Sequence, residues 1–234
     1  MYSFFNRGIW GHKSETLAQM KNVLVTGFEP FGGEMINPSA LAAQVLDGRL
    51  IGGRRVAGVV LPCVFGKSLE ALSQEMDRTQ PELVICTGQA GGRAEISIER
   101  VAINIEDANI PDNAGNWPLD KPVIAGGPAA YWSTLPIKAI VAALQEARLP
   151  AAISQSAGTF VCNSVFYGLM QTLEQKPGVR GGFIHVPYLP EQARRAADGS
   201  ASLSLDEIVR GLEIVIETSL TTQQDLRAVG GAIS

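Results

Sequence analysis

The feature that most constrains this chain is a recurring pattern of short apolar runs, each ended by glycine or proline, with amphipathic helix patterns between them. Three such runs lie at Asn22–Gly27, Glu82–Gly88 and Gly181–Val186. Runs of this length that are rich in β-branched residues are typical of buried strands. Strands that alternate with amphipathic helices predict an α/β fold, in which helices cover both faces of a mainly parallel sheet.

The other segments fit this architecture. Further strands are expected over Arg55–Val64, Ile96–Ile105 and Ala151–Ser154, and helices are expected from Asn37, over Lys67–Asp77, over Leu135–Ala147 and from the capping box at Ser204–Glu207. Between them, Asp107–Pro128 is rich in Pro, Gly, Asn and Asp, so we expect a long loop. Loops of this length inside a domain are usually functional or mobile.

Length and composition indicate one globular domain, which we expect to span residues 20–234. The 234 residues are 46% hydrophobic and 18% charged, which suits a chain with a large core. Residues 1–19 lack the continuous apolar stretch of a signal peptide. We expect them to be an extension, which is a natural arm, an overlong start assignment or an expression remnant.

Net charge, hydropathy and the spacing of the cysteines exclude several classes of function. The net charge of -4 and the absence of a dense basic run argue against a nucleic-acid partner. No stretch has the ~20 apolar residues that a membrane helix needs. Cys63, Cys86 and Cys162 are widely spaced and form no CxxC pair, so we expect neither a disulfide framework nor a metal site. Reduced thiols indicate a cytoplasmic protein.

Cys162 is the strongest catalytic candidate. It follows the small, flexible run Ser156–Gly158 and opens a helix pattern whose apolar residues are spaced three and four apart. Unpaired backbone N–H groups and the helix dipole favour an anion at a helix start, so we expect this thiol to ionise more easily than a free cysteine. A buried structural cysteine is the alternative reading.

A cysteine nucleophile needs a base, and the base needs a third group to fix its tautomer. The chain has two histidines, and His12 lies in the extension, so His185 is the candidate base. Glu99, inside a strand pattern, is the candidate third group. Taken singly, His185 also fits a core histidine, and Glu99 fits a surface carboxylate paired with Arg100.

The candidate residues follow the expected strands. Ligands of α/β folds bind beyond the carboxyl ends of the strands. Phe28 and Phe31 follow one strand, Gln89 follows a second, Cys162 follows a third and His185 lies near the end of a fourth. We therefore expect these side chains to meet at one edge of the sheet.

Six motifs make the chain similar to the family of pyroglutamyl-peptidase I, also called pyrrolidone-carboxylate peptidase. In chain order they are Gly27–Gly33, Gly88–Arg93, Glu99–Asn104, Ile110–Asn113, Ala157–Asn163 and Gly182–Tyr188. The resemblance implies a three-layer α/β/α sandwich like that of nucleoside phosphorylases. It also implies a homo-oligomer, often a tetramer, that uses neither a metal nor an organic cofactor.

The same resemblance implies a reaction and a set of roles. Cys162 is then the nucleophile, His185 the general base and acid, and Glu99 the third member of the triad. The reaction is hydrolysis of the bond after an N-terminal pyroglutamyl residue of a peptide, through a thioester acyl-enzyme.

The substrate itself suggests how its pocket is built. A pyroglutamyl group is a neutral lactam, so flat apolar walls and a few neutral hydrogen-bonding groups should hold it. Phe28, Phe31 and Phe160 are the expected walls, although Phe160 fits core packing equally well. Asn37, Gln89 or backbone groups of the glycine loops are the expected partners of the ring N–H and C=O. The backbone N–H of Cys162 and one further donor are expected to hold the oxyanion.

One position departs from the family pattern. The residue two before the Pro-Asp-Asn stretch is commonly arginine in the family, and here it is Asn109. A positive charge near the thiolate or Glu99 is then missing, or Arg93 or Arg100 supplies it.

Two other classes of function compete with the peptidase. Glycine loops after strands suggest a nucleotide- or phosphate-binding protein, including a phosphorylase-like enzyme that does not need Cys162, but the chain has no GxGxxG and no complete P-loop. The other class is a non-catalytic scaffold.

Overall fold

The computed structural model describes residues 22–196 and 200–231, so the expected extension of residues 1–19 lies outside the described part. The strands run as β1 (Asn22–Phe28), β2 (Leu50–Ile51), β3 (Arg54–Leu61), β4 (Pro81–Gln89), β5 (Ile96–Glu99), β6 (Val101–Ile103), β7 (Ala130–Trp132), β8 (Ala151–Ser154) and β9 (Arg180–Val186). The helices run as α1 (Pro38–Leu46), α2 (Lys67–Thr79), α3 (Ile137–Glu146), α4 (Val161–Glu174), α5 (Pro190–Ala193) and α6 (Leu205–Thr221).

Seven of these strands form one sheet, in the order β2-β3-β1-β4-β9-β5-β8. Neighbours from β3 to β9 pair in parallel, and so do β5 and β8. By contrast, β5 runs antiparallel to β9, and β2 runs antiparallel to β3. The prediction of a mainly parallel sheet is confirmed.

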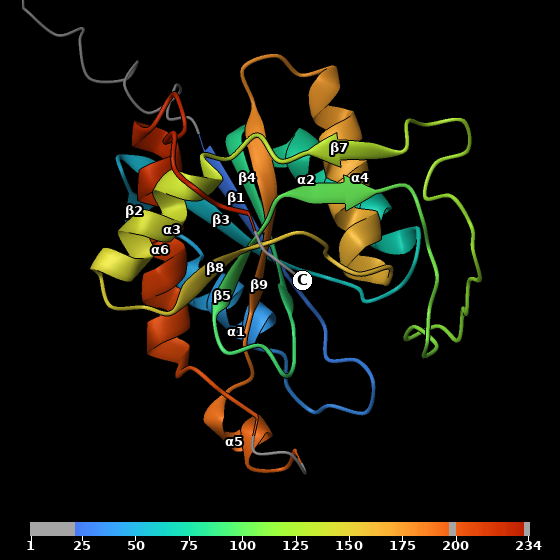
Figure 1. Cartoon of the computed structure of the whole chain (residues 1–234). Helices are drawn as coiled ribbons and strands as arrows, with labels where there is room; N and C mark the ends of the chain where they lie inside the picture. The colour runs from blue at the N-terminus through green and yellow to red at the C-terminus, as the bar shows by residue number, and fades with distance from the viewer. Residues whose placement is uncertain (1–21, 197–199, 232–234) are drawn as a thin grey trace, which may run out of the picture.

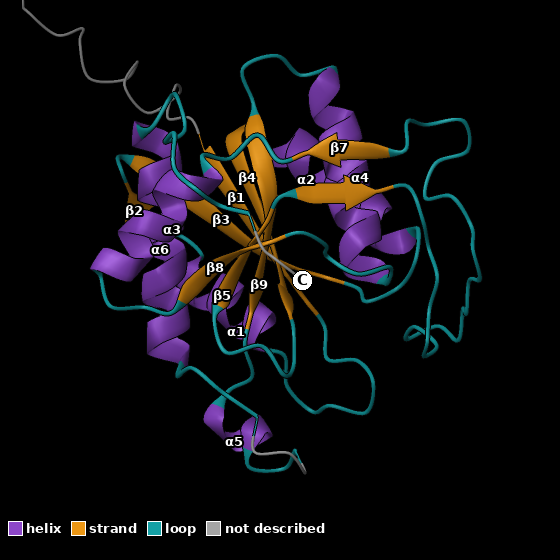
Figure 2. Cartoon of the chain, viewed as in Figure 1, coloured by secondary structure: helices purple, strands orange, loops and turns teal. Residues whose placement is uncertain are grey.

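Helices cover both faces of the sheet, which confirms the α/β/α prediction. On one face α1, α3 and α6 build a core with the strands, and on the other face α2 and α4 build a second core (Figure 2). The carboxyl ends of β1, β4 and β9 point toward the lower edge in Figure 1, where the short helix α5 also lies. Within the described part of the chain, no helix is long and apolar enough to cross a membrane.

The helix that carries Cys162 is buried more completely than its sequence pattern predicts. Every residue of α4 from Val161 to Met170 is buried, not only one face of the helix. The reason is that α2 and a separate two-stranded sheet of β6 and β7 pack on α4 in addition to the main sheet.

The run Ile96–Ile105 was expected to be one strand, and this prediction is wrong. The chain breaks at Arg100, whose N–H donates to the carbonyl of Ser154 and whose carbonyl accepts from the N–H of Ser133, each at 2.9 Å. Before the break β5 belongs to the main sheet, and after it β6 pairs with β7. The alternating pattern continues across the break, so it could not show that the partner changes.

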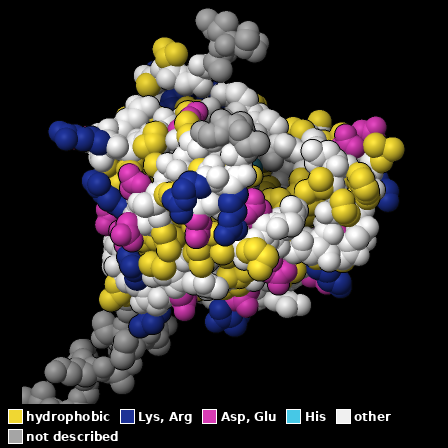
Figure 3. Space-filling view, turned by 90° about the horizontal axis from the view of Figure 1, so that it is seen from below, with side chains coloured by type: hydrophobic (Ala, Val, Ile, Leu, Met, Phe, Trp, Pro, Cys, Tyr) yellow, Lys and Arg dark blue, Asp and Glu magenta, His cyan; other side chains and the backbone are white. Residues whose placement is uncertain are grey.

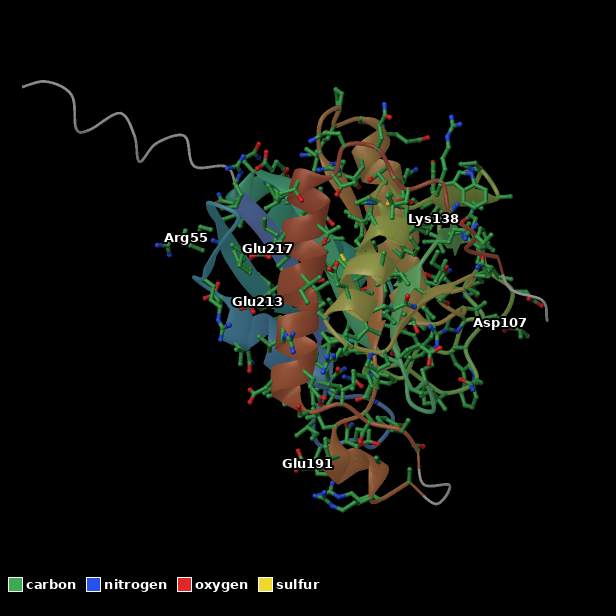
Figure 4. The ribbon with its side chains drawn as sticks, turned by 60° about the vertical axis from the view of Figure 1, so that its left-hand side comes forward. Arg55, Asp107, Lys138, Glu191, Glu213 and Glu217 are labelled. Carbon is green, nitrogen blue, oxygen red and sulfur yellow. The ribbon has the colours of Figure 1, made fainter. Side chains whose placement is uncertain are left out.

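The capping box predicted at the start of α6 is confirmed. Ser204 Oγ accepts from the N–H of Glu207 at 3.3 Å, and the Glu207 carboxylate accepts from the N–H of Ser204 at 2.8 Å. Leu212 of this helix is buried, while Glu213 and Glu217 lie on its outward side (Figure 4).

Candidate active site

Cys162 lies in the first turn of α4, as predicted, and Phe160 is the N-cap residue. The side chain of Asn163 fixes this helix start on β6. Its amide donates to the carbonyl oxygens of Ile103 at 2.8 Å and Ile105 at 3.0 Å, and it accepts from the N–H of Ile103 at 3.0 Å. Because Asn163 is fully buried, these bonds form in a low-dielectric setting that strengthens them.

The sulfur of Cys162 and the imidazole of His185 lie on the same face of the sheet. Gly88 of β4 pairs with His185 of β9, and paired residues of neighbouring strands project to the same side. The sulfur occupies the space over Gly88, since a Cβ at that position would lie 2.8 Å from Cys162 Sγ and 3.0 Å from the ring of Phe183. The ring centroids of Phe183 and His185 lie 4.9 Å apart. These contacts make the thiol and the imidazole neighbours.

Glu99 holds the other side of the imidazole. Its Oε1 lies 2.7 Å from His185 Nδ1, and its side chain is completely buried. An ionised carboxylate only accepts hydrogen bonds, so the Nδ1 atom carries the proton. In a neutral imidazole this tautomer leaves the lone pair on Nε2, which is the atom that a general base uses.

The strands that carry or precede the candidate residues do not all run in the same direction, although the sequence predicts that they do. β8, the strand before Cys162, and β5, the strand of Glu99, both run opposite to the strand of His185. The candidate residues therefore do not all follow carboxyl ends at one edge of the sheet. The segment between β8 and α4 carries the chain from Ser154 to the helix start instead.

The thiol of Cys162 is not easily ionised, which corrects the sequence-based expectation. Burial raises its pKa well above the ordinary value, and the neighbouring Cys63 and Glu99 raise it further. Arg93 and the backbone N–H of Cys162 lower the pKa, but desolvation outweighs them. Cys162 therefore keeps its proton until a base removes it.

Arg93 supplies the positive charge beside Glu99. It lies between β4 and β5, and its Nη1 donates to Glu99 Oε1 at 2.7 Å. That oxygen thus accepts from both His185 and Arg93, while Glu99 Oε2 has no hydrogen-bond partner among the described residues. Arg100, the other arginine left open by the sequence, donates instead to the carbonyl of Gly230.

Aromatic rings line the chain next to the start of α4. Phe31 packs on Phe160 with ring centroids 5.7 Å apart, and Phe65 meets Phe160 edge-on at 5.2 Å. All three are partly exposed. Phe28 is 1% exposed and packs against Phe183 in the core, with ring centroids 6.4 Å apart. The structure thus brings Phe31 and Phe160 together and places Phe28 among core residues.

The side chain of Asn37 already has protein partners. Asn37 is the N-cap of α1: its Oδ1 accepts from the N–H of Ser39 at 3.0 Å, and its amide donates to the carbonyl of Glu29 at 3.1 Å. It is 2% exposed. These bonds hold the loop between β1 and α1, which carries Phe31.

The side chain of Gln89 lies on the opposite face from the thiol. Gln89 pairs with Val186, whose side chain belongs to the core built with α1, α3 and α6. Its Oε1 accepts from Gln192 of α5 at 2.8 Å. The structure therefore does not bring this side chain together with Cys162 and His185.

The long loop after β6 is anchored to the segments that carry the aromatic rings. The carboxylate of Asp112 accepts from the N–H of Phe65 at 2.9 Å. Asn113 donates from its side chain to the carbonyl of Pro30 at 2.9 Å. One loop thus joins the segment before α2 to the segment before α1.

The same loop is joined to the chain before Cys162. Asp107 donates its N–H to the carbonyl of Thr159 at 3.0 Å and accepts from the Thr159 hydroxyl at 2.6 Å. Asn109, Trp117 and Leu119 on this loop are exposed. In Figure 3 the molecule is seen from the lower edge, and hydrophobic side chains gather on the flank where Figure 1 places this loop.

Sequence reasoning missed Phe65. No pattern could have found it, because a lone aromatic residue between a strand and a helix fits the core equally well. Arg93 was one of two arginines left open, and only tertiary structure separates it from Arg100.

Comparison with known proteins identifies close relatives. The pyroglutamyl peptidase family model matches residues 21–222. The pyrrolidone-carboxylate peptidase of Erwinia tasmaniensis is 56% identical over 213 residues, which cover 91% of this chain and 99% of the relative. That of Chromobacterium violaceum is 56% identical over 214 residues, which cover 92% and 100%.

Solved structures agree with these relatives. The crystal structure of pyroglutamyl peptidase I from Bacillus amyloliquefaciens superimposes with a TM-score of 0.87 at 48% identity, over 89% of this chain and 99% of that chain. A mutant pyrrolidone carboxyl peptidase from Pyrococcus furiosus has a TM-score of 0.82 at 46% identity, over 85% and 98%.

Proposed function

This chain belongs to the pyroglutamyl peptidase family, and from that premise we propose that Cys162, His185 and Glu99 are its catalytic triad. The protein is a cysteine peptidase that removes an N-terminal pyroglutamyl residue from peptides. One observation carries the choice of residues: the sulfur of Cys162 lies against Gly88, the strand partner of His185, whose Nδ1 is 2.7 Å from Glu99.

In the first half of the reaction, His185 Nε2 removes the proton of Cys162 as the sulfur attacks the pyroglutamyl carbonyl carbon. A base is required here because burial keeps the thiol protonated in the free enzyme. The imidazolium that forms is stabilised by Glu99, which already holds Nδ1–H. The oxyanion is held by the N–H of Cys162 at the start of α4 and one further donor.

Collapse of this intermediate breaks the C–N bond. His185 gives its proton to the leaving amine, and the pyroglutamyl group stays on Cys162 as a thioester. A water molecule, deprotonated by the same imidazole, then attacks the thioester carbonyl. The products are free pyroglutamate and the thiol, which recovers its proton from His185.

The aromatic cluster supports a site for the lactam ring. Phe31, Phe65 and Phe160 are partly exposed and lie next to the helix that begins with the nucleophile. Flat apolar rings suit a neutral five-membered lactam. For Asn37 and Gln89, the hydrogen bonds to protein favour a role in holding the loops rather than direct contact with the ring.

Residues 20–234 form one peptidase domain in this proposal, preceded by an extension of residues 1–19. The family match, which begins at residue 21, supports this division. A cytoplasmic location is supported by Cys63, Cys86 and Cys162, which are all free thiols.

The proposed partners are peptides with N-terminal pyroglutamate. The proposed assembly is a homotetramer. Exposed Trp117, Leu119 and Trp132 lie on the long loop and on β7, and they support burial between subunits. Sedimentation velocity of the full chain tests this, since a species that stays monomeric at high concentration contradicts the assembly.

The triad is tested with pyroglutamyl anilide and prolyl anilide as matched substrates. The prolyl ring lacks the lactam carbonyl and carries a cationic amine, so only the pyroglutamyl compound should be hydrolysed. Cys162→Ala should abolish this hydrolysis, whereas Cys86→Ala should retain it. Cleavage that persists in Cys162→Ala contradicts the proposed nucleophile.

A further inference from the structure

Arg93 makes more contacts than an ion pair with Glu99 requires. Its Nη1 donates to Glu99 Oε1 at 2.7 Å and to Ser154 Oγ at 3.3 Å, and its Nη2 donates to the carbonyl of Ser156 at 3.2 Å. Ser154 ends β8, and Ser156 lies in the segment that leads to Cys162. One guanidinium thus joins the carboxylate of the proposed triad to the chain that carries the nucleophile.

The positive charge of Arg93 compensates the energetic cost of burying the Glu99 carboxylate. A fully buried carboxylate is costly unless a cation or several donors compensate it. His185 is neutral whenever it acts as a base, so it cannot be that cation throughout the reaction. Among the described residues, Arg93 and His185 are the ion-pair partners of Glu99, and Arg93 alone keeps its charge at every step.

We propose that Arg93 is a positioning residue of this reaction, which supplies a permanent positive charge beside Glu99 and keeps its Oε1 aimed at Nδ1 of His185 while it fixes the segment before Cys162. This inference rests on the proposed triad. Arg93 is not assigned to the substrate, because the lactam is neutral and three protein acceptors already engage the guanidinium.

The groups around the sulfur define what loss of Arg93 does to the thiol. Cys162 is faced by Cys63 after β3, Glu99 on β5, His185 on β9 and Arg93 before β5. Burial, Cys63 and Glu99 raise the pKa of Cys162, and Arg93 opposes them. Removal of Arg93 therefore raises the pKa of Cys162 further, and thiol ionisation moves to higher pH.

Arg93→Met tests the proposal, because methionine keeps an apolar stem of similar width and removes the charge and the donors. Arg100→Met is the matched control, since this arginine donates to the backbone carbonyl of Gly230 instead. We expect Arg93→Met to lower kcat on pyroglutamyl anilide by about 100-fold with KM changed less than about 3-fold. The pH profile of iodoacetamide alkylation at Cys162 should shift to higher pH.

Arg93→Lys distinguishes the effect of losing the positive charge from the effect of losing the hydrogen bonds of the guanidinium. Lysine restores a cation but not the fork that reaches three acceptors, so its kcat should lie between those of the wild type and Arg93→Met. Arg100→Met should behave as the wild type. The proposal is overturned if Arg93→Met keeps the wild-type kcat and alkylation profile, or if Arg100→Met shifts both equally.

Failure of the triad itself would look different. In that case the wild-type protein and Cys162→Ala would hydrolyse the anilide equally, whatever stands at position 93. Thermal unfolding of each variant shows whether it is folded, and the alkylation profile is measured on the folded protein, so a loss of stability cannot imitate the shift.

Discussion

At the scale of single residues, the site depends on a close approach at Gly88. The absent side chain of this glycine leaves the space that the sulfur of Cys162 and the ring of Phe183 occupy. Since Gly88 pairs with His185, a Cβ added there projects to the face that carries the sulfur and the imidazole, and it displaces the sulfur. Catalysis of this kind loses rate steeply when reacting groups move by about 1 Å.

Gly88→Ala should therefore lower kcat by about 100-fold, because its Cβ displaces the sulfur from the imidazole. Steady-state assays on pyroglutamyl anilide measure this, and circular dichroism reports whether the fold is kept. Gly231→Ala is the control, since no atom lies within 4 Å of a Cβ built there. A folded Gly88→Ala protein with wild-type kcat would show that the sulfur does not use this space.

At the scale of elements, the long loop and α6 stabilise the protein in different ways. The loop is organised by Asp112, whose carboxylate accepts four hydrogen bonds from the N–H groups of Phe65, Ala114 and Asn116 and from the Asn116 amide. By contrast, α6 is stabilised at its start by Ser204 and packs on the face of the sheet that does not carry Cys162. A defect in the loop should reach the site, and a defect at Ser204 should not.

Asp112→Ala should raise KM for pyroglutamyl anilide by about 10-fold, because the segments that carry the aromatic rings lose a common anchor. Burial would raise the pKa of Asp112, but its hydrogen bonds with Asn116, Phe65 and Ala114 lower it overall. Its stabilising effect is thus complete above the ordinary carboxyl range and is lost as pH falls through the lowered pKa. Lys121→Ala, an exposed position on the same loop, is the control and should leave KM unchanged.

Ser204→Ala should lower the free energy of unfolding by about 1 kcal/mol, because the N-cap acceptor for the N–H of Glu207 is lost. Urea denaturation measures the loss, and kcat/KM should stay at the wild-type value. The control is Ser73→Ala, at an exposed interior position of α2, where alanine is the better helix former. Equal losses in both variants would argue against the cap.

At the scale of the whole molecule, one sheet is shared by two cores. One core contains α1, α3 and α6, and the other contains α2 and α4 with all three cysteines. Because β1, β3, β4 and β9 contribute buried side chains to both cores, the two cores should unfold together. Groups buried in one core then affect the stability of the entire chain.

Alkaline pH should reveal this through Cys86. Burial raises the pKa of this fully buried thiol from 9.0 to about 12. The unfolded chain releases the proton near 9.0 and the folded chain holds it, so stability is unchanged below that range and falls as pH rises through it. We expect the urea-unfolding free energy to fall between about pH 9 and about pH 12. The fall should be smaller in Cys86→Ala, and equal falls would contradict the assignment to this thiol.

Local sequence patterns predict most of the strands and helices and the main candidate residues, but not β2, β7, α5 or the break between β5 and β6. The apolar runs located β1, β4 and β9, and the helix pattern placed Cys162 in the first turn of α4. Ser204 marked the start of α6. These properties depend on residues a few positions apart, whose spacing and chemistry are visible in the chain itself.

Tertiary structure decided how these elements meet. In the folded chain β5 runs antiparallel to β9, and the Gln89 side chain lies on the opposite face of the sheet from Cys162. Arg93, and not Arg100, forms the ion pair with Glu99. It also buried Cys162, whose pKa rises although a helix start favours the thiolate. The order of the strands, the face of the sheet on which a side chain lies and its desolvation all depend on contacts between residues far apart in the chain. No local sequence pattern predicts them.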